Sequence, residues 1–171
     1  MDQIKNVLRY SAAFLLLSYG LAKLDGVQFA FSPEQLRQPI GTISGFWLTW
    51  YYYGYSHAYA CILGAIQVLA ATLLMFRRTT LLGAMIAAPV LTNILLIDIF
   101  FRISWPATGI AAYLLTVCAV FLFESRDAFM GLLWRSQPNE SMTGSFLRWG
   151  VRLALVALAI GQAAFEVIRS R

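Results

Sequence analysis

The sequence predicts an all-α membrane protein: a transmembrane four-helix bundle followed by a fifth, C-terminal hydrophobic helix. Hydrophobic residues make up 60% of the chain and charged residues only 12%, whereas soluble domains average about 25% charged residues. Residues 79–101 carry one formal charge, Asp98, and are long enough to cross the hydrocarbon core as a helix. Similar apolar runs recur on both sides of this segment, so we expect several spans.

Four apolar runs account for the predicted bundle. They cover residues 7–24, 55–76, 79–101 and 105–123. The first follows Lys5 and lacks a clear signal-peptide cleavage site, so we expect a retained helix. Only Arg77 and Arg78 separate the second run from the third, which predicts a tight hairpin with both arginines at the lipid headgroups.

The chain as a whole divides into three predicted segments. These are a four-helix membrane domain (1–124), a polar cytoplasmic loop (125–148) and the fifth helix (149–171). The last apolar run, 153–168, contains Gln162 and Glu166. It either crosses the membrane or lies on its surface, and we favour the crossing.

The distribution of Lys and Arg predicts the topology. Whether the last helix crosses or not, more of these residues fall on the inner side when the N-terminus is cytoplasmic. We therefore expect a multi-pass protein of the cell inner (plasma) membrane with its N-terminus in the cytoplasm. The net charge of +5 does not indicate nucleic-acid binding, because the basic residues lie at the ends of apolar runs, where they face lipid headgroups.

An aromatic segment, residues 26–54, connects the first two runs on the predicted outer side. Its rings, Trp50 among them, suit the boundary between membrane and water. The segment is interpreted either as an interfacial anchor or as a lid over a pocket that opens toward the outer leaflet.

Polar residues from three helices are predicted to meet near the outer face. Asp98 and Arg102 are four residues apart and are expected to pair on one helix face, and Lys23 is expected to contact Asp98. The alternative to a binding site is a salt-bridge cluster that only fixes helix register. The candidate ligand-binding residues are Tyr19, Lys23, Trp50, His57, Asp98 and Arg102.

Two uncharged polar residues, Gln67 and Asn93, lie inside apolar runs. They either line a cavity or form hydrogen bonds between helices. The sequence predicts no metal site, because it has one histidine and no pair of neighbouring cysteines. Cys61 and Cys118 are isolated in apolar runs and are expected to be buried, which argues against thiol-disulfide chemistry.

Short motifs in the first two runs suggest a family. Gly20-Leu21-Ala22-Lys23-Leu24 resembles the G-x-x-K-L signature that ends the first span of DoxX-like membrane proteins. Gly64-Ala65-Ile66-Gln67 matches a second family pattern in part, with Gln67 where a glutamate is common. The resemblance covers residues 5–124. It implies a four-helix bundle that serves electron-transfer or maturation complexes, as in the small subunit of a thiosulfate:quinone oxidoreductase, and it singles out Lys23.

Two functional hypotheses follow. In the first, the protein is a redox-associated subunit that binds quinone or another amphipathic ligand near the outer leaflet, and a redox or secreted partner protein supplies the electrons. In the second, it is a non-catalytic membrane scaffold or assembly factor for a partner protein. We expect the lipid bilayer to surround the protein. The sequence does not decide whether it forms a homo-oligomer or whether it is an enzyme.

Overall fold

The computed structural model describes residues 2–26, 28–133, 153 and 157, and every secondary-structure element among them is helical. The predicted all-α fold is thereby confirmed for the described residues. The predicted fifth helix and most of the predicted loop lie outside the part of the chain that is described here. A short helix, α7 (Arg126–Leu133), occupies the beginning of that loop segment.

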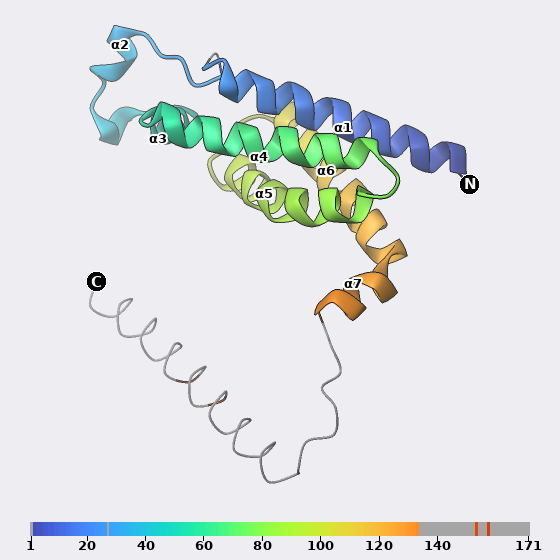
Figure 1. Ribbon diagram of the computed structural model, residues 1–171. Helices are drawn as coiled ribbons and strands as arrows, with labels where there is room; N and C mark the ends of the chain where they lie inside the picture. The colour runs from blue at the N-terminus through green and yellow to red at the C-terminus, as the bar shows by residue number, and fades with distance from the viewer. Residues whose placement is uncertain (1, 27, 134–152, 154–156, 158–171) are drawn as a thin grey trace. The chain divides into compact units, whose positions relative to one another are not determined.

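Four long helices correspond to the four apolar runs, and each is long and apolar enough to cross a membrane. They are α1 (Asp2–Leu24), α4 (His57–Met75), α5 (Thr80–Phe100) and α6 (Trp105–Glu124). These helices pack side by side, with α4 between α1 and α5, and α6 against α5 (Figure 1). The protein is therefore a membrane protein by the length and composition of its helices.

The aromatic segment between α1 and α4 folds into short helices (Figure 1). They are α2 (Pro33–Leu36), a 3-10 turn (Ile40–Thr42) and α3 (Gly45–Gly54). Serine side chains cap α2, α3, α4 and α6, and Ser32 caps α2 by accepting a hydrogen bond from the backbone N–H of Gln35. Ser44 caps α3, Ser56 caps α4 and Ser104 caps α6, each by accepting a hydrogen bond from a backbone N–H three residues later.

Two glycines allow α1 and α4 to approach closely. A methyl group on Gly64 would lie 2.7 Å from the carbonyl oxygen of Gly20, and one on Gly20 would lie 2.9 Å from the carbonyl oxygen of Gly64. These distances leave no room for a side chain at either position. The same close approach fixes the register of the residues one turn further along each helix, Lys23 and Gln67.

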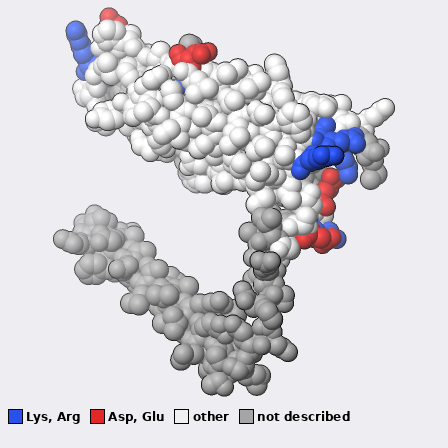
Figure 2. Space-filling model, in the orientation of Figure 1, with Lys and Arg blue, Asp and Glu red and all other residues white. Residues whose placement is uncertain are grey.

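The main core lies between the four long helices and is built mostly from small residues. Alanines predominate where α1, α4 and α5 meet, and larger side chains come mainly from α6. Cys118 is fully buried there, whereas Cys61 is only half-buried, so the expectation for the cysteines is confirmed for Cys118. In the view of Figure 2, the long sides of the helices are uncharged, and a cluster of Lys and Arg lies at the end where α1 begins.

Candidate ligand-binding cavity

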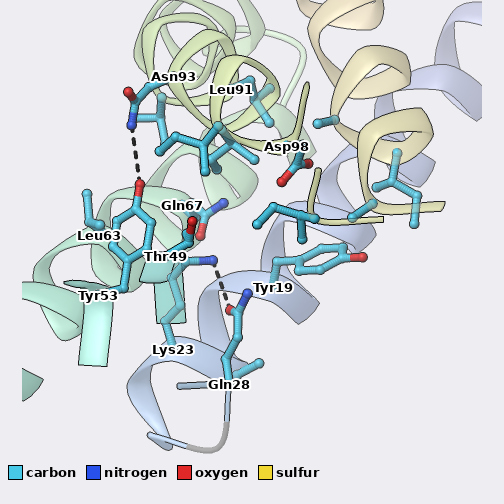
Figure 3. Close-up of a pocket in the computed structure, with 18 of the residues that line it drawn as sticks. Tyr19, Lys23, Gln28, Thr49, Tyr53, Leu63, Gln67, Leu91, Asn93 and Asp98 are labelled. Carbon is cyan, nitrogen blue, oxygen red and sulfur yellow. Dashed lines mark hydrogen bonds between the residues drawn. The ribbon is translucent and has the colours of Figure 1, made fainter. Parts of the chain in front are cut away.

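A cavity of about 390 Å³ lies where α1 and α5 end and where α4 and α6 begin; we call this the cavity end of the protein. Its volume is within the range of sites that hold small molecules, about 300–1,000 Å³. The walls are mostly aliphatic and aromatic side chains from α1, α3, α4, α5 and α6. The polar residues that line the cavity are Tyr19, Lys23, Gln28, Thr49, Tyr53, Gln67, Asn93, Asp98 and Ser104 (Figure 3).

Lys23 brings an ammonium group into this apolar space. Its side chain is only 6% exposed, and Nζ donates a hydrogen bond of 3.0 Å to Oε1 of Gln28 (Figure 3). Nζ also lies 5.9 Å from the centres of the Tyr19 and Phe29 rings, within range of weak cation–π attraction. An ammonium has three N–H donors, so the group keeps donor capacity for a ligand in the cavity.

Gln67 lies beside the cavity without a partner for its carbonyl oxygen. The side chain is 3% exposed, and Oε1 has no hydrogen-bond partner among the residues that the structure describes. A buried polar atom without a partner costs about 1–3 kcal/mol, so such atoms are rare in folded proteins. Gln67 therefore offers a prepared hydrogen-bond site to a molecule in the cavity.

Asp98 contributes a carboxylate from the last turn of α5 and is 8% exposed. It lines the same cavity as Lys23, but the two residues form no ion pair among the described residues. The predicted direct contact is therefore wrong. The two side chains do not meet because α1 packs mainly against α4, so the cavity lies between Lys23 and α5.

The predicted pairing of Asp98 with Arg102 is also wrong. The pairing required one continuous helix, but α5 ends at Phe100 and Arg102 adopts a positive φ of 52°. The Arg102 side chain is exposed and does not line the cavity. The end of the helix before Arg102 removes the i, i+4 geometry that the predicted pair requires.

His57 also lies outside the cavity lining. Its ring is exposed at the start of α4, where Nε2 is 3.4 Å from Sγ of Cys61. The ring also packs beside Gly26, in the turn that follows α1. His57 is thus close to the end of α1, as predicted, but it does not face the polar groups of Lys23, Gln67 and Asp98.

One known protein places the chain in a family. The chain is 36% identical over 133 residues to the uncharacterized protein YwoB of Bacillus subtilis (strain 168), and this alignment covers 78% of the chain and 83% of YwoB. The chain belongs to the YwoB family. No protein-family model and no solved structure matches it, so the resemblance of this YwoB-family protein to DoxX-like proteins stays a prediction.

Aromatic rings form one wall of the cavity in this YwoB-family protein. Trp50 stacks on Phe46 with the ring centres 4.1 Å apart and meets Phe29 edge to face at 5.5 Å. Phe29 in turn stacks on Tyr53 at 5.2 Å. In contrast, the Tyr55 ring is 92% exposed. Some rings of the segment therefore line the cavity and others face outward, while the position of the segment at the membrane boundary stays a prediction.

Tyr53 and Asn93 join the aromatic wall to α5. Nδ2 of Asn93 donates a hydrogen bond of 3.4 Å to the Tyr53 hydroxyl, and both residues line the cavity (Figure 3). Burial raises the pKa of Tyr53 to about 12, with a further contribution from Tyr59, so its phenol stays neutral at physiological pH. Asn93 thus fulfils both roles that the sequence left open.

Four of the six candidate ligand-binding residues line the cavity, as do both structural polar residues. Those four are Tyr19, Lys23, Trp50 and Asp98. Four polar lining residues were not among the candidates from the sequence: Gln28, Thr49, Tyr53 and Ser104. Thr49 gave a usable signal, because it is the one small polar side chain within a run of aromatic residues. Nothing in the pattern marks Gln28, whose position depends on the turn after α1. Among the described residues, no group of His, Cys, Asp or Glu could hold a metal ion.

The contact of Gly45 with α5 supports a prediction about the cavity wall. A methyl group at Gly45 would lie 2.5 Å from the carbonyl oxygen of Phe101, so Gly45→Ala must push α3 away from α5. We expect hydrogen–deuterium exchange of the α3 amides to accelerate about tenfold, which corresponds to about 1.4 kcal/mol of lost local stability. Gly41→Ala is the control, because Gly41 has nothing within 4 Å. Equal exchange in the two variants would contradict the contact.

Proposed function

We propose that this protein holds quinone or another amphipathic molecule in the cavity, as a redox-associated membrane subunit. The observation that carries the proposal is the buried Oε1 of Gln67, which has no hydrogen-bond partner among the described residues and lies in the wall of a mostly apolar cavity. A polar head would lie at Gln67, Lys23 and Asp98. An apolar tail would follow the aliphatic and aromatic walls.

The polar groups suit both redox forms of a quinone. Quinone carbonyls need hydrogen-bond donors, which the Lys23 ammonium and the Gln67 amide N–H provide. A quinol hydroxyl needs an acceptor, which the unpartnered Oε1 of Gln67 and the Asp98 carboxylate provide. A site with both kinds of group can hold a molecule that gains and loses protons.

The electrons in this proposal come from a redox or secreted partner protein, because the chain carries no motif for flavin, haem or iron–sulfur clusters. The two glycine motifs support a likeness to DoxX-like subunits. Gly20 and Gly64 touch at the crossing of α1 and α4, and Lys23 and Gln67 follow one turn later in the cavity wall. We place the protein in the plasma membrane with a cytoplasmic N-terminus and the cavity toward the outer leaflet.

Trp50 provides a direct test with decylubiquinone, a short-chain quinone that quenches tryptophan fluorescence. In a variant with Trp50 as its sole tryptophan, we expect saturable quenching in mild detergent. A second variant that keeps only Trp105, whose side chain is 89% exposed, reports quinone dissolved in the micelle. Linear quenching in both variants would overturn the proposal.

Replacing Lys23 tests the polar head of the site. We expect Lys23→Met to weaken decylubiquinone binding by about tenfold or more, because a hydrogen bond from a charged donor contributes about 1.5–3 kcal/mol. Lys5→Met is the control, since Lys5 lies near the start of α1 and pairs with Glu124 at 2.8 Å. Unchanged decylubiquinone affinity in Lys23→Met would show that Lys23 does not bind the polar head of the ligand. An absence of saturable binding in the unmodified protein would favour the scaffold alternative.

A further inference from the structure

A second cavity, of about 370 Å³, lies where α1 begins and where the turn joins α4 to α5. We call it the basic pocket. Four of its lining residues are cationic, Lys5, Arg9, Arg77 and Arg78, and none is acidic. From Arg9 to Lys23, α1 rises by about 21 Å, so the basic pocket is separate from the proposed quinone site. In Figure 2 this end carries a dense group of Lys and Arg side chains.

Arg9 is the central feature of the basic pocket. Its side chain is only 4% exposed, and Nε is buried with no hydrogen-bond partner in the part of the chain that the structure describes. A buried guanidinium normally has a carboxylate partner, because the cost of removing its charge from water must be offset. Among the described residues, no carboxylate pairs with Arg9, and the nearby Glu124 pairs with Lys5.

The side-chain oxygen of Asn6 binds two guanidinium groups at once. Its Oδ1 accepts a hydrogen bond of 3.2 Å from Nη2 of Arg9 and one of 3.4 Å from Nη2 of Arg77. Two like charges on a shared neutral acceptor repel each other, and an anion between them would remove that cost. The arrangement leaves donors of both groups available, because each guanidinium has five N–H donors.

We propose that the basic pocket binds a phosphate group. Guanidinium forks match the tetrahedral oxygens of phosphate through paired hydrogen bonds. Basic pockets between transmembrane helices are suited to anionic lipid headgroups. Leu81 and Phe121 give the pocket an apolar side as well, which would suit a lipid. The phosphate belongs either to such a lipid or to a soluble molecule, and the experiment separates these two sources.

The test measures lipid binding to the full-length protein by native mass spectrometry. The probes are dioleoyl-phosphatidylglycerol, dioleoyl-phosphatidylcholine and inorganic phosphate. We expect about a tenfold preference for phosphatidylglycerol over phosphatidylcholine, because one charge-assisted contact is sufficient for that factor. If inorganic phosphate displaces the anionic lipid at millimolar concentration, the pocket takes phosphate from soluble molecules too; if it does not, the lipid is the source.

Arg9→Gln should reduce the preference for phosphatidylglycerol to less than about twofold. The double variant Arg77→Gln/Arg78→Gln should do the same, and because both arginines are exposed it leaves the core intact. Arg126→Gln is the matched control: Arg126 is exposed, does not line the basic pocket and pairs with Asp127. Unchanged lipid preference in both the Arg9 and the double variant would overturn the proposal. Quinone binding at the other end stays unaffected in either case, so the two proposals fail separately.

Discussion

Replacing Gly64 by leucine is expected to abolish the folded protein or to lower its melting temperature in detergent by about 10 °C or more. The first side-chain carbon alone would lie 2.7 Å from the carbonyl oxygen of Gly20 and 3.0 Å from Cβ of Lys23. The backbone of α1 cannot yield locally, so the two helices must separate along their whole contact. Overpacking of a tight core costs about 1–3 kcal/mol and more where backbone must move, and each kcal/mol lowers the melting temperature of a protein this size by about 2–4 °C.

Gly109→Leu is the control for this substitution. Gly109 lies on α6 with nothing within 4 Å, so the same side chain meets open space there. Both positions are glycines within apolar helices, so the change in helix propensity and in hydrophobicity is matched. Fluorescence-detected size-exclusion chromatography and a thermal ramp give the fraction folded and the melting temperature. Equal melting of the two variants would show that α1 and α4 do not cross at Gly20 and Gly64.

The four long helices could be predicted from the sequence because few structures other than an apolar helix of about 20 residues can cross a membrane. Apolar length and flanking charge determine where such a helix begins and ends, and each predicted run overlaps its observed helix. Polar residues inside these runs stand out for the same reason. Lys23 could therefore be assigned to a site from the sequence alone, and Gln67 and Asn93 either to a cavity or to hydrogen bonds between helices.

The contacts between those residues could not be predicted, because they depend on features that a linear pattern does not contain. Arg102 was assigned to the face of Asp98 on the assumption that α5 continues, and the positive φ at Arg102 ends it. The direct contact of Lys23 with Asp98 assumed that α1 and α5 are neighbours, whereas α4 lies between them. Side-chain reach depends on the order of helices in space, which the order along the chain does not determine.

Arg9 illustrates the same limit at the other end of the protein. The sequence places it near the beginning of an apolar run, where a basic residue is expected to face lipid headgroups. In the structure its side chain is buried between helices and lines the basic pocket. The difference arises from the packing of α1 against α4 and α6, which surrounds this one position on its helix.

Gln67→Leu is expected to have two opposite effects: higher stability of the ligand-free protein and loss of the proposed ligand binding. The leucine has a similar size and removes the buried Oε1, for which the described residues provide no hydrogen-bond partner, so we expect a gain of about 1 kcal/mol, or a melting temperature about 2–4 °C higher. The same change removes hydrogen bonds to the polar head of a ligand. Decylubiquinone affinity should therefore fall by about tenfold or more.

Gln28→Leu is the matched control, because it makes the same chemical change at another residue of the cavity. Oε1 of Gln28 accepts the 3.0 Å hydrogen bond from the buried ammonium of Lys23. Its loss leaves that charge without its partner, so we expect Gln28→Leu to lower the melting temperature while Gln67→Leu raises it. The sign of the change in melting temperature therefore distinguishes a polar group that stabilises the ligand-free protein, Gln28, from one that binds a ligand, Gln67. A fall for Gln67→Leu as large as that for Gln28→Leu would show that the Gln67 amide is already bonded within the protein, and the proposed quinone site would lose its main support.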